Sequence, residues 1–242
     1  MGTHGNGTDA GLAWRRRENL DFYRSTETME VTIIKEYGVV HLKNALDLKE
    51  QKSLFEEIVG SVRGVGNAPG TFHLSSGDPG SSNRNEFLHT LGSLLFQRCA
   101  TAVLSNLSVL EISDEPSLKR LGDAASGAKP VNIHNVTGVS YKPAVTMNNH
   151  SDLDRPIYTM SVALGGSCDF TVGKRTSIPH ANERSGNPVT ISMTSGDAIY
   201  FDGGAVPHQV SNINTNTAPS FFTIKNKPNN IARIGVLFRE PC

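Results

Sequence analysis

The chain has 242 residues and is 37% hydrophobic, which is enough apolar material for one sizeable core. Its 23 basic and 23 acidic side chains cancel, so no overall electrostatic field favours binding to nucleic acid. The three cysteines, Cys99, Cys168 and Cys242, lie far apart in the sequence, which argues against a disulfide framework and fits a reducing compartment.

The N-terminal residues differ in character from the rest of the chain. Residues 1–25 are rich in glycine and then basic, which predicts a disordered tail in front of a single domain over residues 26–242. The first residues lack the apolar segment of a secretory signal, and no apolar run approaches the roughly 20 residues that cross a bilayer. We therefore expect a protein of the cytoplasm or nucleus that does not act in a membrane.

Helices are predicted mainly in the first half of the domain. Residues 37–46, YGVVHLKNAL, have the composition of a strand, and residues 46–62 show the apolar spacing of an amphipathic helix with Asp47 as its N-cap. Residues 64–85 are dense in glycine, proline, serine and asparagine, which predicts a long loop. Residues 86–110 are apolar at helical spacing and predict a second packed helix.

The second half of the domain is predicted to be β-rich. Its short segments of β-forming residues are separated by turn residues, a pattern that predicts a barrel or jelly roll in a mainly β, α+β domain. The predicted strand segments are residues 130–141, 157–165, 168–173, 189–203 (two strands around the turn SGD), 208–213, 220–224 and 232–240.

The segment NNHSDLDRP, residues 148–156, places His150 and Asp152 two residues apart. Positions i and i+2 of a strand face the same side, so the two side chains can converge on one ion, or they can be surface residues at a strand end. A metal site needs a second histidine. His208, at the start of HQVSNI, is the best candidate, although a lone histidine is more often a core or loop residue. Two histidines and one carboxylate form the ligand set of non-heme Fe(II) oxygenases.

The last predicted strand, ARIGVLFRE, carries Arg233 and Arg239 six residues apart, so both face one side of it. No acidic residue lies between them, and a charge that points into a β-core is costly unless it is paired. A small dianion between them would satisfy both, because a guanidinium binds a carboxylate in a bidentate manner. Alternatively, one or both arginines lie at strand ends and reach solvent.

Taken together, these motifs resemble the AlkB family of Fe(II)/2-oxoglutarate dioxygenases. The shared order is Tyr141, then His150 nine residues later, then Asp152, then His208 after SGD, and finally Arg-x5-Arg. The resemblance runs from about residue 37 to 240 and includes the opening strand and helix. The long loops align poorly.

The resemblance implies a double-stranded β-helix, or jelly roll, flanked by N-terminal helices. It implies that His150, Asp152 and His208 bind Fe(II), and it assigns no catalytic residue beyond these metal ligands. The loop over residues 60–85 occupies the place where the family has its substrate-gripping lid.

The resemblance also implies how 2-oxoglutarate is held. Arg233 would pair with its distal carboxylate with help from the Tyr141 hydroxyl, and Arg239 would contact the end that chelates iron. Family members often carry asparagine at the positions of Val139 and Gly235, so two further contacts to 2-oxoglutarate are expected to be absent.

The substrate implied by the resemblance is an N-methylated base of DNA or RNA. Asp154 matches an acidic position near the target base, and Phe201 lies near the position of an aromatic residue that stacks on it. The expected enzyme is an oxidative demethylase that consumes O2 and 2-oxoglutarate and releases succinate, CO2 and formaldehyde, acting as a monomer. Two alternatives remain open: a 2-oxoglutarate-dependent hydroxylase of a protein or small molecule, and a non-catalytic jelly-roll scaffold.

Overall fold

The computed structural model describes residues 29–241, apart from residues 63–67, 78–80, 153–156, 175–184 and 224–229. The tail predicted for residues 1–25 lies outside the described residues, and the single-domain division stays a prediction. In the described part the strands are β1 (Glu30–Ile34), β2 (Val39–Lys43), β3 (Gly70–Ser76), β4 (Asn135–Tyr141), β5 (Met147–His150), β6 (Ile157–Gly165), β7 (Ser167–Lys174), β8 (Ser185–Met193), β9 (Ala198–Asp202), β10 (His208–Asn214) and β11 (Arg233–Pro241).

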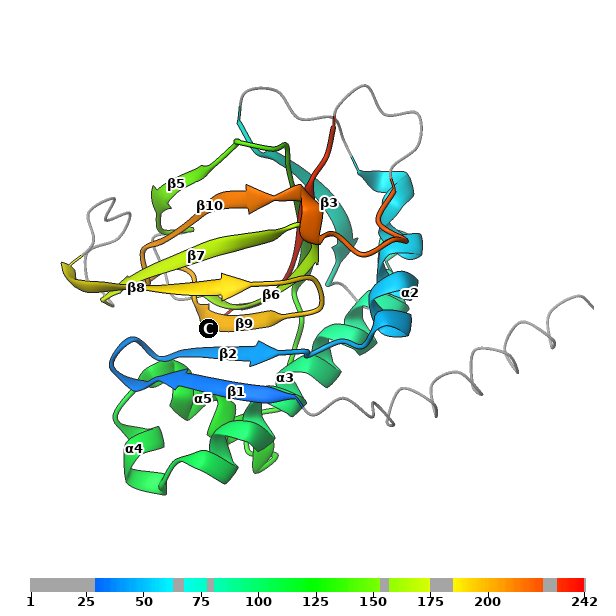
Figure 1. The fold of residues 1–242 in the computed structure, drawn as a ribbon. Coiled ribbons are helices and arrows are strands. Elements are labelled where there is room, and N and C mark those ends of the chain that lie inside the picture. Colours follow the sequence, from blue (N-terminus) through cyan, green and yellow to red (C-terminus); the bar gives the residue numbers. More distant parts are fainter. Residues whose placement is uncertain are drawn as a thin grey trace, which may run out of the picture.

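These strands form two antiparallel sheets (Figure 1). The larger sheet has the order β1-β2-β9-β6-β11-β4-β3, and the smaller sheet has the order β5-β10-β7-β8. Apolar side chains of both sheets form one cluster between them, so the sheets pack face to face. The architecture is the mainly β jelly roll that the sequence predicts.

The helices cover the other face of the larger sheet. They are α2 (Leu48–Ile58), α3 (Glu86–Asn106), α4 (Val109–Ser113) and α5 (Pro116–Ala125). Asp47 caps α2 as predicted, in a reciprocal capping box with Glu50. The Phe96 ring of α3 meets the Tyr200 ring of β9 edge-on, with centroids 5.6 Å apart. No helix within the described ranges is both long enough and apolar enough to span a bilayer.

Strand β11 has different partners on its two faces, because its side chains alternate. The even-numbered residues from Ile234 to Phe238 belong to the apolar cluster beneath the helices. The odd-numbered residues from Arg233 to Leu237 point to the opposite side, where they line a pocket between the sheets. One strand therefore supports both the core and the pocket.

Three predicted elements differ from the structure. The predicted loop over residues 64–85 contains β3, whose buried Phe72 packs on Gly138 of β4. The sequence did not predict this strand, because it is an edge strand with polar residues on its outer face. The segment 220–223 is not a strand, since the rings of Phe221 and Phe222 pack on Phe55 instead. The helix predicted over residues 86–110 ends at Asn106, before α4.

We predict that Gly138→Ala destabilises the fold. A Cβ atom at this position would lie 2.2 Å from Cζ of Phe72, and overpacking of this kind costs about 1–3 kcal/mol. The free energy of unfolding in urea measures the effect. Gly235→Ala is the matched control, because its Cβ would meet nothing closer than 3.7 Å. Equal stability of the two variants would contradict the packing of β3.

Candidate active site

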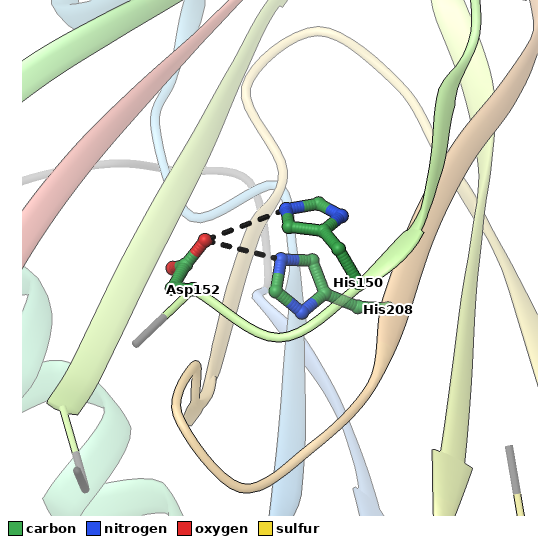
Figure 2. Close-up of side chains that lie close together, drawn as sticks. All are labelled: His150, Asp152 and His208. Carbon is green, nitrogen blue, oxygen red and sulfur yellow. Dashed lines mark ion pairs between the residues drawn. The ribbon is translucent and has the colours of Figure 1, made fainter. Parts of the chain in front are cut away.

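The pairing of β5 with β10 brings two histidines together. His150 ends β5 and His208 begins β10, and the two residues are register partners in this antiparallel pair. Asp152 lies just beyond the end of β5, where its amide donates a hydrogen bond of 2.7 Å to the carbonyl of Gly203. The three side chains converge from two strand ends and one turn (Figure 2).

The geometry of this triad suits a single ion. The Nε2 atoms of His150 and His208 lie 3.5 and 3.7 Å from Oδ1 of Asp152 (Figure 2). One ligand atom from each residue can be chosen so that all three lie within 4.8 Å of one another. Two imidazoles and one carboxylate on one side of an ion leave its other positions open, which fits Fe(II). The structure thus assembles the three predicted ligands, and their occupation by iron stays a prediction.

Backbone carbonyls orient both imidazoles. Nδ1 of His150 lies 2.7 Å from the carbonyl oxygen of Asn148, and Nδ1 of His208 lies 2.9 Å from that of Val206. A carbonyl oxygen only accepts, so each Nδ1 must carry the proton and donate. Each Nε2 therefore faces the common centre, and without a proton of its own it offers the lone pair that a metal ligand requires.

Arg239 contacts the carboxylate of the triad. Its Nη2 donates to Oδ2 of Asp152 at 3.3 Å, and its Nη1 donates to the hydroxyl of Thr137 at 2.6 Å. Oδ1 of Asp152 is left facing the histidines. In the structure Arg239 therefore holds a predicted metal ligand, and its predicted contact with 2-oxoglutarate stays a prediction.

Electrostatics set the protonation of the triad. Burial opposes the charge of Asp152, but the hydrogen bond with His150 and the nearby guanidinium of Arg239 lower its pKa below the ordinary value. The hydrogen bond to Asp152 raises the pKa of His150. Burial lowers the pKa of His208, which keeps that imidazole neutral near pH 7. An ionised carboxylate and a neutral imidazole are the forms that bind a metal.

A pocket joins the triad to the predicted anion site. It opens to solvent and runs from the triad to Arg233 and Tyr141. Its remaining lining residues come from both sheets: Met147, Ser161, Phe170, Phe201, Val210, Gly235 and Leu237.

Arg233 is buried at the far end of this pocket. Only 4% of the residue is exposed, and Nη1 donates to the carbonyl of Gly166 at 2.9 Å. Among the described residues it forms no ion pair. Its register partner Tyr141 is also buried, and burial raises the pKa of that phenol, so it remains a protonated donor. A carboxylate is the ligand that would satisfy both groups.

The two predicted substrate residues have different outcomes. Asp154 lies outside the described residues. Phe201 lines the pocket but is 1% exposed, and its ring packs against those of His208 and Phe170 at 4.7 and 5.4 Å. Its stacking on a base stays a prediction.

Sequence reasoning missed Gly203 and Thr137. Gly203 accepts the amide hydrogen bond of Asp152 and leaves room for its side chain, while Thr137 anchors Arg239. The glycine pair after the strand AIYFD was a visible signal of close backbone approach. The role of Thr137 had no local signal, because it depends on the register of β4 and β11.

Similarity to known proteins is confined to structure. No protein-family model matches the sequence, and no curated protein matches it. The structure of OsALKBH1 aligns with a TM-score of 0.58 at 16% identity, over 87% of this chain and 100% of that chain. A 2OG-Fe(II) oxygenase family oxidoreductase from Burkholderia pseudomallei aligns at 0.48 and 13% identity, over 99% and 93% of the two chains. The non-heme alpha-ketoglutarate-dependent epimerase SnoN from nogalamycin biosynthesis aligns at 0.44 and 17% identity, over 84% and 77%.

The likeness to OsALKBH1 shows a shared fold. At 16% identity it does not carry over activity or site residues. The two chains therefore share their fold over 87% of this chain.

Gly203→Ala should weaken metal binding without unfolding the protein. A Cβ at this position would lie 2.6 Å from Oδ2 of Asp152 and displace the carboxylate. We expect the affinity for Mn(II) to fall by about ten- to a hundredfold, the usual effect of disturbing a group that supports a ligand. Calorimetric titration measures it. Gly60→Ala, with open space around its Cβ, is the control, and unchanged affinity in Gly203→Ala would refute this account of Asp152.

Proposed function

We propose that the protein is an Fe(II)- and 2-oxoglutarate-dependent oxygenase. The observation that carries this proposal is the single pocket that links a His-Asp-His triad to a buried arginine with no described anionic partner. A metal ion at one end and a carboxylate at the other match the two ends of 2-oxoglutarate. A scaffold domain has no need for three convergent ligand groups or for the cost of burying Arg233.

The roles of the residues follow from their contacts. When bound, Fe(II) supplies the oxidation of a substrate C–H bond by O2, coupled to conversion of 2-oxoglutarate to succinate and CO2. Arg233 and Tyr141 would hold the distal carboxylate, and the carbonyls behind the two histidines would keep their Nε2 atoms directed at the metal. Phe170 and Phe201 line the pocket with apolar surface and exclude water from it.

We further propose that the substrate is an N-methylated base of DNA or RNA. Hydroxylation of an N-methyl carbon gives a hemiaminal that releases formaldehyde. The motif order of the sequence supports this reading, and so does the likeness to the structure of OsALKBH1. A base must leave its stack to enter a pocket of this kind. A cytoplasmic or nuclear location is consistent with such a substrate and is part of the proposal.

A protein or small molecule is the second candidate substrate. The balanced net charge gives no general attraction to a polyanion, and Met147 and Val210 bring apolar surface to the pocket. Both features suit an uncharged or apolar group.

Arg233→Met should weaken 2-oxoglutarate binding strongly. Removing one partner of a buried, hydrogen-bonded charge pair costs about 2–5 kcal/mol of affinity, so the Kd should rise at least about thirtyfold. Calorimetry with the Mn(II)-loaded protein measures it. Exposed Lys43→Met is the control. Binding that is indifferent to Arg233 would remove the anion site from the proposal.

The substrate class is tested by formaldehyde release. Methylated DNA and RNA oligonucleotides, methylated peptides and free methylated nucleosides are incubated with the protein, Fe(II), 2-oxoglutarate and O2, and the products are identified by mass spectrometry. We expect the mass to fall by about 14 Da per methyl group, because H replaces CH3. We expect this loss in oligonucleotides and not in peptides or free nucleosides. Asp152→Ala should abolish it. Demethylation or hydroxylation confined to peptides or small molecules would select the second candidate.

A further inference from the structure

Gly235 lies in the middle of the pocket, between its two functional ends. It belongs to the pocket-facing side of β11, with Arg233 two residues before it and Leu237 two residues after it. Four residues further along the strand Arg239 contacts Asp152 of the triad. Any molecule that reaches from Arg233 to the triad must therefore pass over Gly235.

The backbone does not require glycine at this position. Gly235 has no positive φ, and it sits in regular antiparallel register with both β4 and β6. A Cβ atom would be in ordinary van der Waals contact, 3.7 Å or more from its neighbours. Gly203 and Gly138 differ, because a Cβ there would collide with Asp152 or Phe72. Glycine within a strand costs conformational entropy and packs no side chain, so here it leaves space.

The atoms around this space make it suitable for a small group. A Cβ at Gly235 would have Cδ1 of Leu237 at 3.7 Å, the hydroxyl of Ser161 at 3.8 Å and the carbonyl oxygen of Val139 at 4.0 Å. Ser161 belongs to β6, lines the same pocket and is partly exposed to it. The gap thus has one apolar wall and two polar ones, and is the size of a methyl or hydroxyl group.

We propose that Gly235 and Ser161 form a subsite that admits a 2-oxo dicarboxylate with a small substituent on its methylene carbons. The inference rests on the proposed function, because it takes the ligand between Arg233 and the triad to be such an acid. The subsite lies on the side of the carbon chain, while its two ends are held by Arg233 and by the metal.

Binding, measured without turnover, tests the subsite. The full chain is loaded with Mn(II) in the absence of O2 and titrated calorimetrically with 2-oxoglutarate, 3-methyl-2-oxoglutarate and 4-methyl-2-oxoglutarate. We expect at least one methylated acid to bind within about threefold of the parent acid, which is less than 1 kcal/mol. Weakening of both methylated acids by more than about thirtyfold would overturn the proposal.

Two variants fill the gap from the paired strands β11 and β6. Gly235→Ala, which the packing accommodates, and Ser161→Val should each weaken the tolerated methylated acid by about tenfold, and 2-oxoglutarate by less than threefold. Val236→Ala, on the core face of β11, is the control and should leave the ratio of the two affinities unchanged. Thermal unfolding confirms that each variant is folded. If Gly235→Ala and Ser161→Val weakened the binding of 2-oxoglutarate and of the methylated acid equally, the subsite would also be overturned.

The outcomes separate the subsite from the proposed function. If no 2-oxo dicarboxylate binds the native Mn(II)-loaded protein, the proposed function fails. If 2-oxoglutarate binds and depends on Arg233 while the methylated acids are excluded, the proposed function stands and the subsite fails.

Discussion

The hydrogen bond from the amide of Asp152 to the carbonyl of Gly203 joins the two sheets at the candidate site. Asp152 follows β5 of the smaller sheet, and Gly203 follows β9 of the larger one. The register of β5 with β10 sets the two histidines opposite each other, but it does not place the carboxylate. The position of the carboxylate depends on this hydrogen bond between the sheets. It also depends on the absence of a Cβ at Gly203, which lets the Asp152 side chain lie against the backbone.

Two buried arginines of this chain differ in how their charges are satisfied. Arg120 and Glu240 are both almost fully buried and bonded to each other, and the remaining donors of Arg120 reach the carbonyls of Lys129 and Pro130. This pair ties α5 to the end of β11. Arg233 is equally buried, but its described partner is one carbonyl, from Gly166. Its guanidinium lines the pocket, where the carboxylate of the proposed co-substrate would offset the cost of burial.

The division of β11 into two faces makes core and site depend on one strand. Ile234, Val236 and Phe238 are buried beneath the helices, while Arg233 and Gly235 face the pocket. Because the strand is hydrogen-bonded on both sides, to β4 and β6, its position is rigidly defined. The spacing between Arg233 and the triad across the pocket is therefore set by strand geometry rather than by a loop.

Local patterns in the sequence determined the α2 helix with its Asp47 cap, most of the strands and the candidate identity of His150, Asp152, His208 and Arg233, because each depends on spacing along one element. They did not reveal β3, because this edge strand keeps polar residues on its outer face. They also did not reveal that the rings of Phe221 and Phe222 pack on Phe55 instead of forming a strand. Only the tertiary structure decided that Arg239 contacts Asp152, that Thr137 and Gly203 support it, and that Gly235 leaves space beside the pocket. Those contacts join strands far apart in the chain, and register and sheet packing, which fix such distances, leave no local trace in the sequence.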